Sequence, residues 1–474
     1  MKKLVVGAAL MVLLVVCSVA GAWAQGRPFV TKWKFEKNKE VTIPIYGDGY
    51  KLVIADPNGI EDEIAAQSGA YTFTPTETGE YTVKAGPEGG EYMNMENAGG
   101  SREALIEVVQ FGTVEWTSMA NTFRGCKNMT FAASIDVPDL SKVSSMNRMF
   151  QDCMAFNHPS IADWNVGNVT EMNSTFSGCS IFNQSLAGWN VSSVTAMNAM
   201  FFYCTAFNQP LSNWDVSKVT DMSNMFVNCT AFNQSLENWK VGNVTRMHAM
   251  FQGCSSFNQP LSSWNVSKVT TMGNMFVNCS AFNQPLDRWD VSQVTEMSYM
   301  FYKCNSFNQP LEKWNVSNVT NMEYMFSGCN SFNQPLGSWK IQTAVGGLKS
   351  TAMSPSNYSA TLVDWAAQKD AVWGIDFSRD VEELVYNEEG KTAREALIAK
   401  GWRFEGDKYQ AHGVAITPRD LSLALNKEFT LSLDKWGVEE TEQITLSSNK
   451  EGLLSYARSA DGKSIRIKGL KVGE

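Results

Sequence analysis

The sequence predicts an α+β repeat fold, in which a long solenoid of similar units is flanked by small all-β modules. The first observation behind this prediction is a cysteine that recurs every 25 residues, at Cys204, Cys229, Cys254, Cys279, Cys304 and Cys329. The second is a tryptophan series with the same spacing, at Trp164, Trp189, Trp214, Trp239, Trp264, Trp289, Trp314 and Trp339. A fixed period of this size is typical of units that bury their apolar side chains only by stacking on their neighbours.

Each unit is predicted to contain one short helix and one short strand. Apolar side chains follow helical spacing at Val319, Met322, Met325, Phe326 and Cys329. Thr320 stands where it could cap the start of this helix. Residues 332–336 include Pro335 and are expected to be extended, while residues 314–316 alternate apolar and polar side chains, as a short strand does.

This composition of the unit also predicts the curvature of the stack. Strands pair about 4.8 Å apart, whereas packed helices need about 8–10 Å. A stack with strands on one side and helices on the other would therefore curve, with the strands on its concave side.

The motif Met-Phe-x-x-Cys-x-x-Phe-Asn-Gln-Pro-Leu-x-x-Trp-x-Val-Ser-x-Val-Thr-x-Met resembles the repeats of the BspA-like leucine-rich-repeat surface proteins of Bacteroidetes and related bacteria, the family with DUF285-type repeats. The resemblance covers about half of the chain, and residue types agree with spacing over many copies. It implies an LRR-like, right-handed solenoid displayed outside the cell. Some members adhere to host proteins or to other bacteria, and the resemblance implies no single ligand.

Residues 1–24 are predicted to be a secretory signal peptide. Lys2 and Lys3 precede an apolar run over residues 4–16, and residues 22–24 form a small-x-small cleavage site with the cut after Ala24. Lipoprotein processing at Cys17 is the alternative, which Val16 disfavours because a small residue is preferred there. No later apolar run is long enough to span a bilayer, so we expect an exported chain that is not membrane-spanning.

Residues 25–105 are expected to form an N-terminal all-β domain of the Ig-like or PKD-like kind. Apolar and polar residues alternate between turn formers in four short segments, at residues 41–43, 50–54, 71–73 and 81–83. Residues 71–83 resemble the terminal hairpin of such a domain. The solenoid is then expected over residues 106–345, with an irregular first repeat as its N-terminal cap.

Two further segments are expected after the solenoid. Residues 346–411 are predicted to be a C-terminal helical cap, with an amphipathic helix over residues 355–367 and a second closing segment over residues 391–402. Residues 412–474 resemble an Ig-like β-module, with strands expected at 414–416, 429–433, 444–446 and 465–467. This module lacks an obvious last strand, which leaves open that the chain continues past Glu474.

The repeated residues are more plausible as structural ladders than as sites. The cysteines could form disulfides or bind metal, but helices about 8–10 Å apart would hold them too far apart, and no CxxC or Cys/His cluster is present. We therefore expect buried free thiols. The tryptophans could form a sugar-binding stripe, but Trp214 shares a strand face with Val216, which predicts a core ladder. Asn208 and its equivalents are expected to stack and satisfy turn backbone groups.

The sequence contains no recognisable catalytic, cofactor or metal site. His158, His248 and His412 are scattered, and none lies beside a nucleophile in a known order. The formal net charge of −9 argues against a nucleic-acid partner.

These features together predict an exported, non-enzymatic binding protein of the adhesin type, either extracellular or on the cell surface and associated with the outer membrane. It would recognise a host or bacterial protein or glycan through the solenoid surface. The alternative is a structural surface-layer or spacer protein without a specific ligand, and a glycan-acting enzyme is a third possibility. The candidate binding positions carry no ranking. Those just before a tryptophan are Ser212, Asn213, Glu237, Asn238, Asp287, Arg288, Glu312 and Lys313, and those expected on the helix exteriors are Lys218, Arg246 and Glu296.

Overall fold

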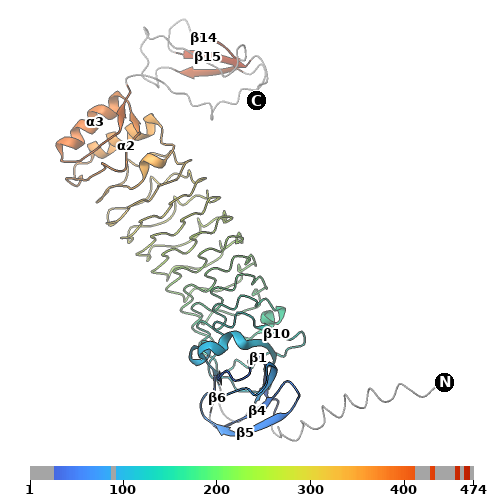
Figure 1. Cartoon of the computed structure of the whole chain (residues 1–474). Helices are drawn as coiled ribbons and strands as arrows, with labels where there is room; N and C mark the ends of the chain where they lie inside the picture. Colours follow the sequence, from blue (N-terminus) through green and yellow to red (C-terminus); the bar gives the residue numbers. More distant parts are fainter. Residues whose placement is uncertain are drawn as a thin grey trace.

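The computed structural model describes residues 26–47, 49–86 and 92–410, together with the backbone of residues 428–432, 454–458 and 464–469. Figure 1 shows an N-terminal β-sheet module, an elongated stack of coils and a closing pair of helices. Each coil is one repeat of the sequence. The predicted signal peptide lies outside the described residues. One continuous apolar core runs from Phe29 to Phe404.

The N-terminal module is built on a six-stranded sheet with the strand order β10-β9-β1-β7-β4-β5. Its strands are β1 (Phe29–Phe35), β4 (Tyr50–Ala55), β5 (Glu61–Gln67), β7 (Gly79–Ala85), β9 (Leu105–Gln110) and β10 (Thr130–Phe131). Two antiparallel pairs accompany it: β2 (Val41–Ile43) with β6 (Tyr71–Phe73), and β3 (Ile45–Tyr46) with β8 (Tyr92–Met93). The four strands that the alternation predicts are confirmed as β2, β4, β6 and β7.

The hairpin predicted over residues 71–83 is wrong. β6 pairs with β2, whereas β7 pairs with β1 and β4, so the chain passes from one sheet to another between them. Phe73 on β6 instead packs its ring against Phe35 and Tyr81, with ring centroids 5.7 Å and 6.2 Å apart. Apolar packing between the sheets therefore replaces direct pairing of the two strands.

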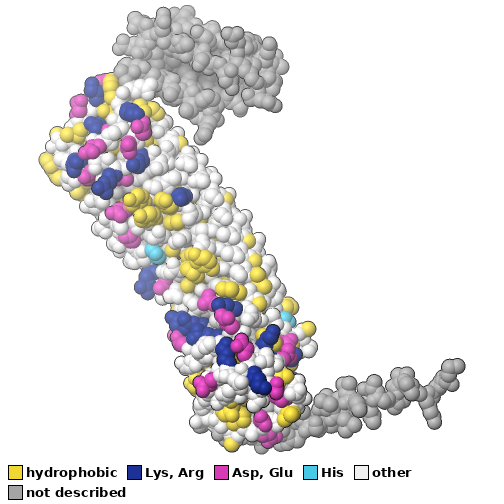
Figure 2. All heavy atoms as spheres, viewed as in Figure 1, with side chains coloured by type: hydrophobic (Ala, Val, Ile, Leu, Met, Phe, Trp, Pro, Cys, Tyr) yellow, Lys and Arg dark blue, Asp and Glu magenta, His cyan; other side chains and the backbone are white. Residues whose placement is uncertain are grey.

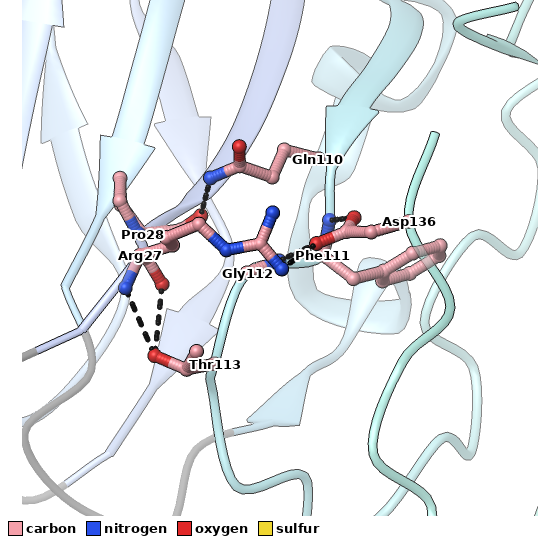
Figure 3. Close-up of polar contacts among 7 residues, drawn as sticks. All are labelled: Arg27, Pro28, Gln110, Phe111, Gly112, Thr113 and Asp136. Atoms are coloured by element: carbon pink, nitrogen blue, oxygen red, sulfur yellow. Dashed lines mark hydrogen bonds and ion pairs between the residues drawn. The ribbon is translucent and has the colours of Figure 1, made fainter. Parts of the chain in front are cut away.

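The module and the stack of coils are joined through a shared sheet and a polar clasp. Two short 3₁₀ helices, η1 (Met95–Asn97) and η2 (Gly99–Ala104), lead into β9, and β10 from the first coil pairs with β9 in parallel. Figure 3 shows the clasp, in which Asp136 accepts hydrogen bonds from the backbone N–H groups of Phe111 (2.6 Å) and Gly112 (2.9 Å) and pairs with Arg27 (3.0 Å). The sheet thus crosses residue 105, the limit expected for the N-terminal domain.

The helix and the strand predicted in each repeat are both wrong. Between residues 132 and 347, all of them described, the only regular element is the 3₁₀ helix η3 (Pro159–Asp163). Residues 314–316 form no strand; the coils instead meet at isolated parallel bridges such as Glu296 with Asn321. Thr320 caps no helix, and its hydroxyl donates to the carbonyl of Thr295 one coil earlier (3.2 Å).

The apolar spacing that mimics a helix comes from consecutive turns. The N–H groups of Tyr299 and Phe301 donate to carbonyls of the next coil, at 2.8 Å and 3.0 Å. The N–H groups of Met300 and Tyr302 donate to carbonyls three residues back, as in β-turns and not as in an α-helix. Inward side chains then recur every three or four residues without a helix.

Without helices, the predicted concave strand side has no physical basis. Ring stacks on different parts of the coil have similar spacings, with centroids 5.7 Å apart for Phe226 and Phe251 and 6.4 Å apart for Trp239 and Trp264. The array accordingly extends as an elongated column (Figure 1).

The tryptophan and cysteine ladders are confirmed as core. Trp239 is 2% exposed, and its indole N–H donates to the carbonyl of Leu211 (2.9 Å). Each of the nine described cysteines is free and buried, and the thiol of Cys254 donates to the carbonyl of Phe226 (2.9 Å). The expectation of buried free thiols is confirmed, although the stacked helices from which it was argued do not exist.

The predicted amide ladder is also confirmed. The side-chain oxygen of Asn233 accepts hydrogen bonds from the backbone N–H of Asn258 and the side-chain amide of Gln259, both at 3.0 Å. The last rung, Asn333, receives the backbone N–H of Ser354 (2.8 Å) and the side-chain amide of Asn357 (2.9 Å). The cap therefore continues the pattern of the repeats.

The C-terminal cap contains η4 (Leu348–Ser350) and the helices α2 (Pro355–Ala367) and α3 (Glu388–Ala399). α2 has the predicted bounds and begins where the Ser354 hydroxyl accepts the N–H of Asn357 (3.3 Å). The parallel pair of β11 (Val385–Tyr386) and β12 (Lys408–Tyr409) flanks α3. Arg394 and Asp407 form an ion pair of 2.8 Å in which the carboxylate side chain is fully buried.

In the last module the strand order is β13-β15-β14, and both pairs are antiparallel. β13 (Glu428–Ser432) and β15 (Ser464–Gly469) confirm two predicted strands, and β14 (Leu454–Arg458) was not predicted. The strands predicted at 414–416 and 444–446 lie outside the described residues.

The position of the tryptophan ladder can be tested by truncation. We expect Trp239→Ala to lower the free energy of unfolding by about 3–5 kcal/mol, because a buried indole is removed from between two neighbours. Arg246→Ala is the control, since its side chain is 62% exposed and its ion pair with Asp221 is worth about 1 kcal/mol or less. Chemical denaturation of both variants measures the difference, and a Trp239→Ala protein as stable as its parent would contradict the core assignment.

The cysteine ladder predicts slow thiol chemistry. Burial raises the pKa of the Cys329 thiol to about 12 and that of Cys254 well above its ordinary value, so both stay protonated at neutral pH. We expect a maleimide reagent to label the native protein only after denaturation, with or without prior reductant. Rapid native labelling, or labelling that needs a reductant, would contradict buried free thiols.

Candidate functional site

The candidate site lies on the surface formed by the first two turns of each coil, here called the turn face. In one coil it comprises Ser298, Tyr299, Tyr302 and Lys303, and the same positions recur every 25 residues. Other exposed polar positions serve coil-to-coil ladders, as Asn233 and Thr320 show. Two turn-face residues in the first coils, Asn147 and Asn173, also belong to such a ladder, but the side chains of the turn face otherwise differ from coil to coil.

Two positions of each turn face have a left-handed backbone. They are the third residues of successive turns, where asparagine and glycine are preferred. Several coils follow that preference, with Asn224 at φ 61°, Asn274 at φ 61° and Gly253 at φ 76°. Others carry large side chains there, namely Arg148, Tyr203, Tyr299, Lys303 and Tyr324, all at φ between 55° and 58°. A left-handed conformation costs an ordinary L-residue about 1–2 kcal/mol.

Two of these large side chains, Tyr299 and Tyr324, form a tyrosine cluster together with Tyr302, whose backbone is not left-handed. The rings of Tyr299 and Tyr324 stack with centroids 4.8 Å apart and planes 21° apart. The ring of Tyr302 meets that of Tyr299 edge to face at 5.5 Å. The Tyr324 side chain is half exposed. Figure 2 shows hydrophobic side chains gathered in separate patches along the array, with charged side chains beside them.

The stack of tyrosine rings ends at Tyr324 because the following coil is shorter. Phe301 donates its N–H to the carbonyl of Met325, and one coil later Phe326 donates to Gly346 (3.0 Å). Gly346 follows Met325 by 21 residues instead of 25, so the coil lacks the four residues that would match 321–324. A Cβ at Gly346 would lie 2.2 Å from the backbone nitrogen of Tyr324, so only glycine fits this approach.

The charges around the cluster are mixed. The Lys303 ammonium lies over the ring of Tyr302, 5.2 Å from its centroid. The Glu296 carboxylate accepts hydrogen bonds from the Ser298 N–H (2.6 Å) and the Asn321 amide (3.0 Å). Desolvation, followed by the nearby Tyr324 and Glu323, raises the pKa of the Tyr299 phenol, which therefore stays neutral and can donate a hydrogen bond.

A second, smaller aromatic patch lies four coils before Tyr302, toward the N-terminus. Phe202 and Tyr203 place their ring centroids 4.7 Å apart, and Tyr203 is 48% exposed. Tyr203 has φ 58° and donates its N–H to the carbonyl of Val227 (2.7 Å). The same combination of exposed aromatic ring and left-handed backbone therefore occurs twice on the turn face.

The candidate positions named from the sequence do not form this cluster. Arg246 and Glu296 occupy the bridging position of their coils and not a helix exterior, and Lys218 lies in the turn between Val216 and Val219. The candidate positions just before each tryptophan lie in a turn outside the turn face, where Asp287 pairs with Lys313 at 2.7 Å. The tyrosines were missed, although the sequence shows Tyr299 and Tyr324 at a position that other coils fill with asparagine, as at Asn224 and Asn274.

The histidines are not assembled into a site within the described residues. The His158 ring accepts the backbone N–H of Ser160 (3.3 Å) at the start of η3, and desolvation lowers its pKa. His248 lies on the turn face of its own coil, and His412 is outside the described residues. The described part of the chain contains no group of three or more His, Cys, Asp or Glu side chains suited to a metal ion. None of its helices is both long and apolar enough to cross a membrane.

The repeats match one family model. The model for the family described as "Mycoplasma protein of unknown function, DUF285" matches residues 117–237, 204–294 and 262–365. These overlapping segments cover residues 117 to 365, more than half of the 474-residue chain. The chain belongs to the DUF285 repeat family. The DUF285 segments include the whole turn face described above and reach into α2. No curated protein and no solved structure matched the chain.

The backbone cost of the exposed tyrosines can be measured directly. We expect Tyr324→Asn and Tyr203→Asn to leave the free energy of unfolding unchanged or to raise it by up to about 1 kcal/mol, because asparagine tolerates the left-handed backbone better. Chemical denaturation is the measurement.

The matched control is Tyr358→Asn within α2. Tyr358 is fully buried and donates its hydroxyl to Asp407 (2.9 Å), so the variant should lose about 3 kcal/mol or more. If Tyr324→Asn lost as much as this control, the cluster would be part of the core and not a candidate site.

Proposed function

We propose that this DUF285 protein is an exported, non-enzymatic binding protein of the adhesin type. It acts in the extracellular space or on the cell surface, associated with the outer membrane, and its partner is an extracellular protein or glycan of a host or of other bacteria. The predicted signal peptide and the similarity of the repeats to BspA-like surface proteins support export and display. The net charge of −9 disfavours a nucleic-acid partner.

We also propose a finer description of the fold. The repeats correspond to an LRR-like, right-handed solenoid in which turns take the place of helices. The N-terminal module is an Ig-like or PKD-like spacer, and the module after residue 412 is a second Ig-like spacer. The shared sheet of β9 and β10 and the Asp136 clasp support a role of the N-terminal module as a firm mount for the solenoid.

The tyrosine cluster is the observation on which the binding function rests. Strained backbone persists where the surrounding structure imposes it, and it is concentrated at functional sites. Here the ladder holds Tyr299 and Tyr324 in a left-handed conformation, and the Tyr324 ring remains half exposed. Exposed aromatic rings on a rigid frame are frequent anchors of binding surfaces. A ligand that uses these rings explains why asparagine or glycine is not present.

A structural spacer without a specific ligand is the second candidate. The continuous core from Phe29 to Phe404 favours it, because such a core makes a stiff column. A spacer, however, has no use for exposed rings that raise the cost of folding. The two functions therefore differ in what they expect of the tyrosine cluster.

Binding to arrayed ligands tests the proposal. The mature chain, residues 25–474, is applied to arrays of extracellular-matrix proteins and glycans, alongside a triple variant with Tyr299, Tyr302 and Tyr324 each changed to asparagine. We expect saturable binding by the parent and at least about tenfold weaker binding by the variant, which corresponds to about 1.4 kcal/mol.

The control is Trp373→Asn, which removes a side chain that is 73% exposed in the cap, away from the turn face. This variant should bind as the parent does. Absence of binding by the parent at high micromolar concentration would favour the spacer, and equal binding by the parent and the triple variant would move the site to another surface.

A further inference from the structure

We propose that the tyrosine cluster is a subsite for an acidic oligosaccharide, in which a pyranose ring stacks on the open face of Tyr324 and Lys303 contacts the carboxylate of a neighbouring sugar. This inference rests on the proposed binding function and names the ligand class for the same site. It combines the shape of the cluster, its size and the charge beside it.

The open face follows from the stacking order of the coils. One face of the Tyr324 ring is covered by Tyr299 at 4.8 Å. The following coil, which contains Gly346 and Gly347, is four residues shorter and supplies no matching tyrosine. With one face covered by Tyr299, the Tyr324 side chain is still half exposed, so part of its ring is open to solvent. The apolar C–H face of a pyranose is flat and of similar size to a phenol ring, so it can stack there.

The cluster is also rigid before any ligand binds. The N–H groups of Tyr299 and Lys303 donate to carbonyls of the next coil, at 2.8 Å and 2.7 Å. Tyr302 donates its N–H to the carbonyl of Tyr299 (3.0 Å) within the same turn. Because the backbone is held on both sides, little conformational entropy is lost on binding, which matters for a ligand with few contacts.

The size of the cluster favours an oligosaccharide over a protein surface. A stable protein interface buries about 800 Å² on each partner, whereas a tyrosine contributes at most about 150–250 Å². Of the three tyrosines, only Tyr324 is as much as half exposed, and the neighbouring turn-face residues Ser298, Ser327 and Gly328 are small. Ring stacking with a few polar contacts is the pattern of a small-ligand subsite.

Lys303 supplies the charge preference. Among the described residues it forms no ion pair, and its ammonium lies over Tyr302, which in turn contacts Tyr299. A carboxylate on the ligand would give this cation an acidic partner. Nucleic-acid bases also stack on aromatic rings, but they need a cationic groove along the strand, and the cluster has a single lysine near Glu296 and Glu323.

The test uses the full mature chain and immobilised oligosaccharides of equal length, one set carrying uronic or sialic acids and the other neutral. We expect binding to acidic members, with dissociation constants then measured by calorimetry on the strongest of them. Tyr324→Asn should weaken binding by about tenfold or more, while Tyr324→Phe, which keeps the ring, should stay within about threefold of the parent. Lys303→Gln should weaken binding to the acidic oligosaccharide by about fivefold and reduce its dependence on salt.

Three other results would overturn the proposed subsite or the role of Lys303 in it. If no oligosaccharide binds but an arrayed matrix protein does, and the triple asparagine variant loses it, the glycan subsite is overturned while the binding function stands. Equal affinity for neutral and acidic sets, unchanged in Lys303→Gln, overturns the role of the lysine. Concentration-dependent self-association that disappears in Tyr324→Asn assigns the cluster to a second copy of the chain and overturns the subsite.

Discussion

The structure depends on one constraint, which is that every coil completes the hydrogen bonds of its neighbour. Alternate N–H groups in the turns, such as those of Asn224 and Phe226, donate to carbonyls of the following coil at 2.9 Å. A coil that followed a different path through the turns would leave these buried groups unpaired, at a cost of about 1–3 kcal/mol each. The regular 25-residue period from Cys204 to Cys329 agrees with this requirement, and the side-chain ladders follow from the period. Indole, thiol and amide groups each reach one coil back because their equivalents lie there.

The same constraint explains the two ends of the array. An end coil has donors or acceptors with no neighbour, so a different element must supply the partner. At the first coil, β10 joins the sheet of the N-terminal module through β9, and Asp136 receives two backbone N–H groups. At the last coil, Thr361 of α2 accepts the N–H of Leu336 (3.0 Å), and Gln368 donates to the carbonyl of Gly337 (2.9 Å). Both caps are thus continuations of the hydrogen-bond pattern as well as covers for the core.

The constraint also determines where function can reside. Side chains that build the buried ladders cannot change without loss of stability, whereas the turn-face side chains differ from coil to coil. The backbone there is nevertheless imposed by the ladder, so a tyrosine can be held at φ 55° when local preference favours asparagine. Shortening of one coil, before Gly346, then exposes the end of the tyrosine stack. Recognition on this scaffold arises from substitution at strained positions and from a change in coil length.

The sequence by itself determined the repeat architecture, because a period of 25 residues with inward tryptophan and cysteine admits only a stack. It also determined α2, because a Ser-Pro start followed by apolar residues at helical spacing specifies a helix. The sequence could not distinguish a helix from consecutive turns, since both bring apolar residues inward every three or four positions. The hydrogen bonds to the next coil decide in favour of turns. It likewise could not pair β6 with β2 instead of β7, because the packing of Phe73 against Phe35 and Tyr81 joins residues far apart in the chain. The tyrosine cluster was decided only by the tertiary structure, which shows that Tyr299 and Tyr324 have positive φ, that their rings stack and that Tyr324 remains half exposed.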